Sequence, residues 1–254
     1  MLCSIKQCCL WAVLLGALLV SAQNNFLLFH SVAEMFSVVI ALAIFMIARN
    51  ARHFLGNDLL PFLGITYLFV GMFDAVHLLS YKGMGVFPNV STEVSIQVWI
   101  VARYMECLSL AFAAYFAKHR MPEGTVFLAY SCISLFLISS IFIWQVFPTC
   151  YVDGVGLTAF KKNSEYIIAT VLLGCAIYWA GNRKLFDDSV YTLLVASMVV
   201  TVVSELFFTL YVDVYGLFNI RGYFLKIVSF LFIYNAIIES GLIKPYTLFF
   251  HDVK

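Results

Sequence analysis

Seven long apolar stretches, separated by short polar segments, dominate the pattern of hydrophobic and polar positions along the chain. They cover about residues 26–48, 58–80, 95–117, 124–147, 164–182, 189–212 and 219–240. A helix needs about 20 mostly apolar residues to cross the hydrocarbon core of a bilayer, and each stretch is close to that length. The pattern predicts an all-α fold, a polytopic transmembrane bundle of about eight helices, made of these seven and a short N-terminal one.

The N-terminal segment, residues 1–22, is also apolar, but its apolar run is short for a full span. Val20-Ser21-Ala22 resembles the small-residue cleavage site of a signal peptide, so the segment is either a retained first helix or a cleaved signal. The rest of the chain shows no linker, repeat or second domain. We expect one membrane domain over residues 23–250 and a short tail over 251–254, with no output domain.

Composition supports a membrane protein and excludes several other classes. Of the 254 residues, 63% are hydrophobic and only 11% are charged, whereas soluble domains carry about 25% charged residues. Membrane lipid is therefore an expected partner. The net charge of +1 gives no electrostatic support for a nucleic-acid partner. We find no phosphate loop, nucleotide motif or nucleophile–base set, so we do not expect an enzyme.

The charges in the connections predict how the helices are oriented. Three alternate short loops are basic, and the positive-inside rule places them, together with the C-terminus, in the cytoplasm. The longer connections, about residues 81–94 and 148–163, then face outside. Lys82, Lys161 and Lys162 lie there against the rule, so they require local partners.

Ionisable residues occur inside the apolar stretches, mostly in the halves predicted to lie toward the outside. His30 and Glu34 are four residues apart, and Asp74 and His77 are three apart, so each pair shares one helix face. Such residues are costly in hydrocarbon, and by default they face the bundle interior and serve a function. A structural role stays open, in which each side chain only hydrogen-bonds a neighbouring helix.

The shared depth of these residues predicts one polar pocket that opens to the outside and binds a small ligand or ion. The candidate ligand-binding residues are His30, Glu34, Asp74, His77, Lys82, Trp99, Arg103, Glu106, Lys161, Glu165, Glu205, Asn219 and Lys226. The charges of the pocket are expected to cancel nearly, because an unpaired buried charge is costly. The five expected acids are Glu34, Asp74, Glu106, Glu165 and Glu205, and the five expected bases are Lys82, Arg103, Lys161, Arg221 and Lys226.

An alternative reading is a transition-metal or haem protein with a sensing or redox role. His30, Glu34, Asp74 and His77 offer nitrogen and oxygen ligands, and helical bundles hold such sites in their cores. Arg103 would repel a cation unless it pairs with an acid. The seven cysteines form no metal pattern, and Cys150 lies alone in a loop.

Two glycine-containing loops, Tyr81–Gly85 and Gly154–Thr158, leave helices at the level of the pocket. We expect them to fold over it as a lid, with Lys82 or Lys161 in an ion pair with one of the acids.

Several motifs together resemble a known family. They are Phe29-His30 with Glu34, Asp74 with His77, Tyr81-Lys82-Gly83-Met84-Gly85, Ala102-Arg103-Tyr104 with Glu106, Gly156-Leu157-Thr158 with Lys161, Asp213-Val214-Tyr215-Gly216-Leu217-Phe218-Asn219, Lys226-Ile227-Val228-Ser229 and Gly241-Leu242-Ile243-Lys244-Pro245. Over about residues 26–250 the chain is similar to the third class of membrane-associated sensor domains, the MASE type.

The resemblance implies a bacterial inner-membrane input domain that acts on a cytoplasmic output, such as a diguanylate cyclase, histidine kinase or phosphodiesterase. It implies two-component or cyclic-di-GMP signalling, through an output domain or a separate protein, with a homodimer as one possible assembly. Family members have Gly-His where this chain has Gly222-Tyr223, which argues against a site of three histidines. Transport is less favoured, because the inner halves of the helices carry almost no charge.

Overall fold

The computed structural model describes residues 5–87, 91–210 and 216–243. The first residues of one family-like motif, 213–215, the last residues of another, 244–245, and the expected tail, 251–254, lie outside the described residues. Eight α-helices account for most of the described chain, which confirms the all-α bundle. They are α1 (Ile5–Asn24), α2 (Phe26–Ala51), α3 (Leu59–Ser80), α4 (Thr92–Phe116), α5 (Glu123–Phe142), α6 (Ala159–Gly181), α7 (Asp188–Leu210) and α8 (Leu217–Ile238).

The seven helices from α2 to α8 are long and apolar enough to cross a membrane, as the sequence predicts. The short α1 precedes them, and whether it is retained or cleaved stays a prediction. Short elements complete the described chain: 3-10 turns at Arg52–Phe54 and Arg183–Leu185, strands β1 (Tyr151–Val152) and β2 (Gly156–Leu157), and a π-helical turn at Glu239–Ile243 that continues α8.

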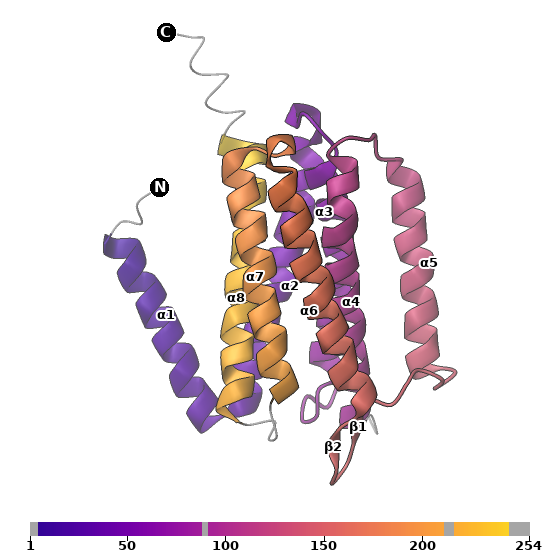
Figure 1. Cartoon of the computed structure of the whole chain (residues 1–254). Coiled ribbons are helices and arrows are strands. Elements are labelled where there is room, and N and C mark those ends of the chain that lie inside the picture. Colours follow the sequence, from indigo (N-terminus) through magenta and orange to yellow (C-terminus); the bar gives the residue numbers. More distant parts are fainter. Residues whose placement is uncertain (1–4, 88–90, 211–215, 244–254) are drawn as a thin grey trace.

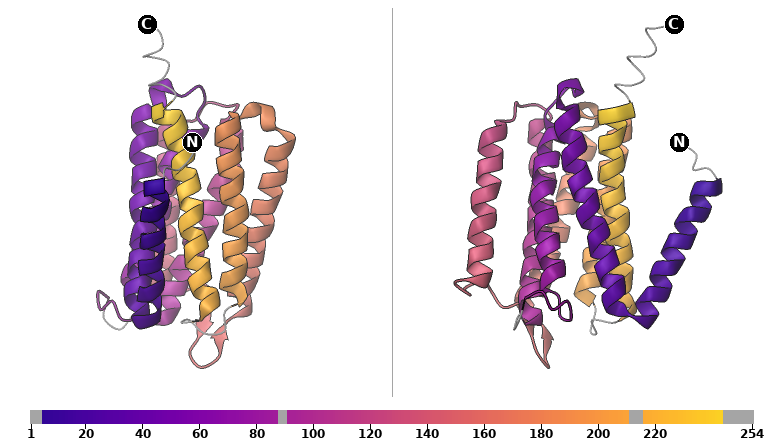
Figure 2. Two further views of the ribbon diagram at one scale, coloured as in Figure 1. Left: turned by 90° about the vertical axis from the view of Figure 1, so that its left-hand side faces the viewer. Right: turned by 180° about the vertical axis from the view of Figure 1, so that it is seen from behind.

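Six helices form a closed ring in the order α2, α3, α4, α6, α7, α8 and back to α2 (Figure 1). Two helices lie outside this ring: α1 meets α2 near their shared turn and then tilts away from the bundle, and α5 packs against α3 and α4 (Figure 2). Only Ser134, Ser140 and Ile141 of α5 are buried, consistent with a helix that faces lipid on most sides. The interior of the ring is therefore the place where polar side chains can avoid hydrocarbon.

Small residues bring α2 and α3 close together within the ring. A Cβ built on Gly64 would lie 2.5 Å from the Cβ of Ala48, and one built on Gly71 would lie 2.8 Å from the Cβ of Ala41. The two pairs are two turns apart on both helices, so the backbones approach each other along a stripe. This close contact sets the positions of the polar residues that α2 and α3 carry farther along.

The β-hairpin marks one end of the bundle, at the bottom of Figure 1, and we call this the hairpin end. The strands pair Tyr151 with Leu157 in antiparallel register, and the carboxylate of Glu93, at the start of α4, accepts hydrogen bonds from the backbone N–H groups of Cys150 and Tyr151. The start of α2, the end of α3 and the starts of α6 and α8 lie at the same end.

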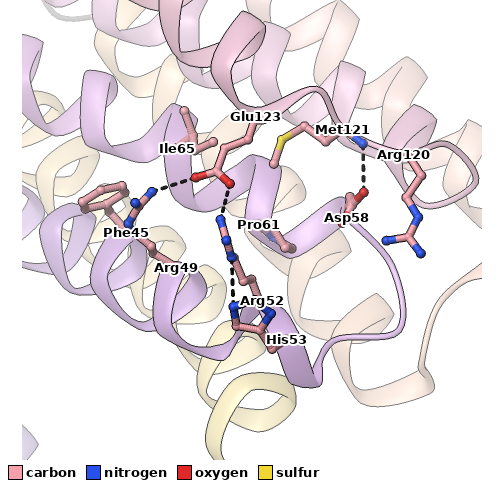
Figure 3. A pocket seen from close by; sticks show the side chains of 10 residues that line it. All are labelled: Phe45, Arg49, Arg52, His53, Asp58, Pro61, Ile65, Arg120, Met121 and Glu123. Carbon is pink, nitrogen blue, oxygen red and sulfur yellow. Dashed lines mark hydrogen bonds and ion pairs between the residues drawn. The ribbon is translucent and has the colours of Figure 1, made fainter.

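The opposite end holds α5 to the ring through polar contacts (Figure 3). Arg49 and Arg52, at the end of α2, donate to the carboxylate of Glu123 at the start of α5, and Asp58 accepts from the backbone N–H of Met121. These residues line a partly open cavity of about 260 Å³. Because Glu123 is shared by both arginines, we interpret the group as a clasp for α5.

Candidate ligand-binding site

All six ring helices contribute ionisable side chains to the interior of the ring. Each of these side chains is at most 3% exposed. They are His30 and Glu34 on α2, Asp74 and His77 on α3, Arg103 and Glu106 on α4, Lys161 and Glu165 on α6, Glu205 on α7, and Lys226 on α8. Trp99 on α4 and Asn219 on α8 are buried as well, so the structure brings together twelve of the thirteen residues expected to form the polar pocket, all but Lys82.

Arg103 is the hub of the central group. Its Nη2 donates to both carboxylate oxygens of Asp74, at 2.8 and 3.1 Å, and its Nη1 donates to Glu106. The other oxygen of Glu106 accepts a hydrogen bond from the hydroxyl of Tyr67 at 2.9 Å. A planar guanidinium suits this arrangement, because it can hold two carboxylates in fixed directions at once.

Lys226 connects α8 to the same group. Its Nζ lies 2.7 Å from Oε2 of Glu34 and 3.2 Å from Oδ1 of Asp74. The indole of Trp99 supports both cations, with Lys226 Nζ at 4.5 Å and Arg103 Cζ at 5.0 Å from the ring centroid. These contacts link α2, α3, α4 and α8 through fully buried charges.

A second group lies between α6 and α7. Lys161 donates to Glu165 and to the backbone carbonyl of Phe208, and Thr209 donates to Glu165 at 2.9 Å. Glu205 interacts electrostatically with Lys161 and Glu165 of this group and with Arg103 and Glu106 of the central one. Glu205 therefore couples the charges of the central group to those of the group between α6 and α7.

Two histidines lie beside the central group, toward the hairpin end. The Nδ1–H of His77 donates to the backbone carbonyl of Ser95 at 2.8 Å, since a carbonyl oxygen can only accept. His77 Nε2, both ring nitrogens of His30 and Oε1 of Glu34 have no hydrogen-bond partner among the described residues. A buried polar group without a partner costs about 1–3 kcal/mol, so these four atoms mark a place that a ligand would satisfy.

Aromatic rings enclose His30. Tyr81 stacks on its imidazole with the ring centroids 3.7 Å apart, and the rings of His77 and Tyr223 meet it edge-on at 5.3 and 5.2 Å. The ring of Tyr223 therefore lies directly against His30.

A narrow cleft of about 40 Å³ reaches the site from the hairpin end. Its walls combine rings with polar side chains, and it has room for a few water molecules or a very small ligand. The lining residues are His77, Tyr81, Thr92, Ser95, Ile96, Trp99, Lys161, Phe208, Asn219 and Tyr223.

Lys82 and Arg221 differ from their expected positions, because both are exposed. The buried set of the described residues therefore contains five acids but only three bases, and the expected cancellation of charge is wrong. Arg221 contacts the ring of Phe218 instead of an acid of the pocket.

The expected lid is present only in part. Lys161 forms the predicted ion pair, with Glu165, but both residues belong to α6, so this pair fixes no loop over the site. The loop after α3 does cover the site, through Tyr81 on His30 rather than through Lys82.

Sequence reasoning missed Tyr67, Ser95 and Thr209, which hydrogen-bond the buried ionisable groups. Tyr67 had a usable signal, because it precedes Asp74 by seven residues and lies on the same helix face. Ser95 contacts His77 through its backbone carbonyl and through its hydroxyl, and a single serine near the start of an apolar stretch gave no distinct signal.

Cys150 lies outside the membrane-spanning helices and has no catalytic character. Burial raises the pKa of its thiol to about 12, with the negative charge of Glu93 acting in the same direction. Since the thiolate is the reactive form, this cysteine is inert near neutral pH.

A ring of apolar helices that encloses fully buried charges defines a multi-pass membrane protein with a polar centre. The chain belongs to the MASE3 family of membrane-associated sensor domains, whose family model matches residues 21–245. No curated protein and no solved structure was found to match it.

Proposed function

We propose that the chain is the sensory input module of a bacterial inner-membrane signalling system, with the hairpin end outside and the end of α8 in the cytoplasm. A small ligand or ion binds at the polar centre from the outside. Binding changes the packing of α8, which passes the signal to a cytoplasmic output domain or protein. Membership of a sensor-domain family supports the general role.

The observation that carries the proposal is the position of Lys226. This α8 residue contacts Glu34 on α2 and Asp74 on α3, which are 192 and 152 positions away in the sequence. A ligand that competes with Lys226 for these carboxylates weakens the ion pairs that hold α8 in the ring. Such a ligand shifts the bundle only if it binds two packings with different affinity.

The far end of α8 is suited to transmit such a shift. At 1.5 Å per residue, Lys226 lies about 18 Å along the helix from Ile238. There the chain enters the π-helical turn Glu239–Ile243, in which Gly241 packs closely against Ala51 at the end of α2. Single π-turns occur frequently at functional sites, and this one lies where an output module would follow.

The test is a fusion of the full chain to a diguanylate cyclase, with cyclic-di-GMP measured in cells. Glu34→Gln, Asp74→Asn and Lys226→Met should each change the basal output several-fold while the protein level in the membrane persists. Glu123→Gln, which changes a partly exposed acid of the α5 clasp, is the matched control and should leave the output unchanged. Unchanged output in all three site variants would remove the buried charges from the signalling mechanism.

A further inference from the structure

We infer that His30, Glu34 and His77 bind a divalent first-row transition-metal ion. The inference deepens the proposed function, because it gives the chemistry of an occupant for the same polar centre. The inference rests on the proposed function only where it says that a bound metal affects signalling. Metal binding itself can be measured independently of signalling.

The donor atoms converge from two neighbouring helices. One donor atom each from His30, Glu34 and His77 lies within 4.8 Å of the other two, and all three residues are buried. Ligand atoms bound to one ion at about 2.0–2.2 Å lie roughly 3.3 Å apart. Small side-chain rotations are therefore enough to bring the three donors onto one ion.

Two of the three donors, those of His77 and Glu34, are also held in a state that suits a metal ligand. His77 Nδ1–H is engaged by the carbonyl of Ser95, which leaves the lone pair of Nε2 directed away from that contact. Glu34 uses Oε2 for Lys226 and keeps Oε1 without a hydrogen bond. Protein metal sites commonly orient their ligands in this way, with the second atom of each ligand held by a neighbouring group.

The nearby cations do not oppose the ion, because each is already paired. Arg103 is held by Asp74 and Glu106, and Lys226 by Glu34 and Asp74. Asp74 was expected among the metal ligands, but its oxygens are taken by these two cations, so the site has three protein ligands. The buried set holds five acids against three bases, so a bound cation adds charge of the sign that the set lacks.

Two imidazole nitrogens and one carboxylate oxygen select the class of metal. Calcium and magnesium prefer sites made wholly of oxygen, and no cysteine belongs to the group, so zinc or iron(II) fits best. Haem does not fit, because the rings of His30 and His77 meet edge-on at 5.3 Å and leave no room for a porphyrin between them. Three protein ligands leave a position for water or an added ligand, and His77 borders the cleft.

The experiment uses the purified full chain in detergent, stripped with a chelator and titrated with Co²⁺, whose visible bands report its coordination. We expect one Co²⁺ per chain, displaced by Zn²⁺. His30→Gln, His77→Gln and Glu34→Gln should each weaken binding at least about tenfold, which is the loss typical even for residues that only orient a ligand. His53→Gln and His119→Gln, which change exposed histidines, should retain full binding.

Wild-type protein that binds no Co²⁺ would overturn the inference without any variant. Binding that all three site variants retain would overturn it as well.

The metal site and the sensing role can fail independently of each other. If Co²⁺ binds through these residues but chelation leaves the output of the fusion unchanged, the metal site stands and its role in sensing is wrong. If no metal binds but Glu34→Gln changes the output, the sensing role stands and the metal is wrong.

Discussion

Lys226 on α8 donates to Glu34 on α2 at 2.7 Å, although the two residues are 192 positions apart in the sequence. Both side chains are at most 3% exposed, so each depends on the other for compensation of its charge. The same lysine contacts Asp74, and Asp74 is the main partner of Arg103. One α8 residue therefore completes a charge network that includes α2, α3 and α4.

The first prediction follows from this network. Lys226→Met leaves Glu34 without its cation and weakens the compensation of Asp74, and breaking one side of a buried ion pair typically costs about 3–5 kcal/mol. We expect a loss of this size in the free energy of unfolding, measured with a denaturing detergent.

The double variant Glu34→Gln/Lys226→Met provides the control. Because the neutral amide no longer needs a cation, adding Glu34→Gln to Lys226→Met should restore part of the stability. Strict additivity of the two single changes would show that the pair is not coupled.

The sequence predicted the fold well because membrane helices satisfy their backbone groups internally, and length and hydropathy then define them. It also found most of the buried charges, since an ionisable residue in an apolar stretch has few alternatives to the bundle interior. It failed for Lys82 and Arg221 because residues near helix ends can reach solvent, and sequence alone does not show which way they turn. The exact partner of each charge depends on helix rotation, which packing decides.

Tyr67 is a partner of a buried charge that the sequence did not show, and it gives the second prediction. Tyr67→Phe removes the hydroxyl that donates to Glu106 and leaves a buried carboxylate oxygen without that bond. The expected loss is about 1–3 kcal/mol of unfolding free energy. Tyr166→Phe, at an exposed position of α6, is the matched control and should change stability by less than about 0.5 kcal/mol.

The third prediction concerns the contact of α2 with α3. Gly71→Ala places a methyl group 2.8 Å from the Cβ of Ala41, so the helices must separate and the charged residues that they carry must shift. We expect overpacking to cost about 1–3 kcal/mol. Gly174→Ala, where nothing lies within 4 Å of the new Cβ, should be neutral or stabilising, because alanine favours a helix over glycine. Equal effects of the two substitutions would contradict a close contact.

The fourth prediction tests the clasp of α5. Glu123→Gln removes the acid shared by Arg49 and Arg52, but all three side chains are at least 34% exposed. Solvent screens such pairs, so the loss of unfolding free energy should be below about 1 kcal/mol. A loss comparable to that of Lys226→Met would show that the clasp is a main support of the bundle.

The last prediction uses Cys150, which anchors the start of the hairpin. Its thiol is fully buried, and its pKa is raised to about 12, so the neutral form dominates far above neutral pH. Alkylation of Cys150 in the folded chain, followed by peptide mass spectrometry, should therefore rise about tenfold per pH unit from pH 8 to pH 10 without levelling off. In the detergent-unfolded chain the rate should level off above about pH 9, near the ordinary pKa of a cysteine. A folded chain that showed the same plateau would mean that the hairpin opens to solvent and that Glu93 does not hold it against α4.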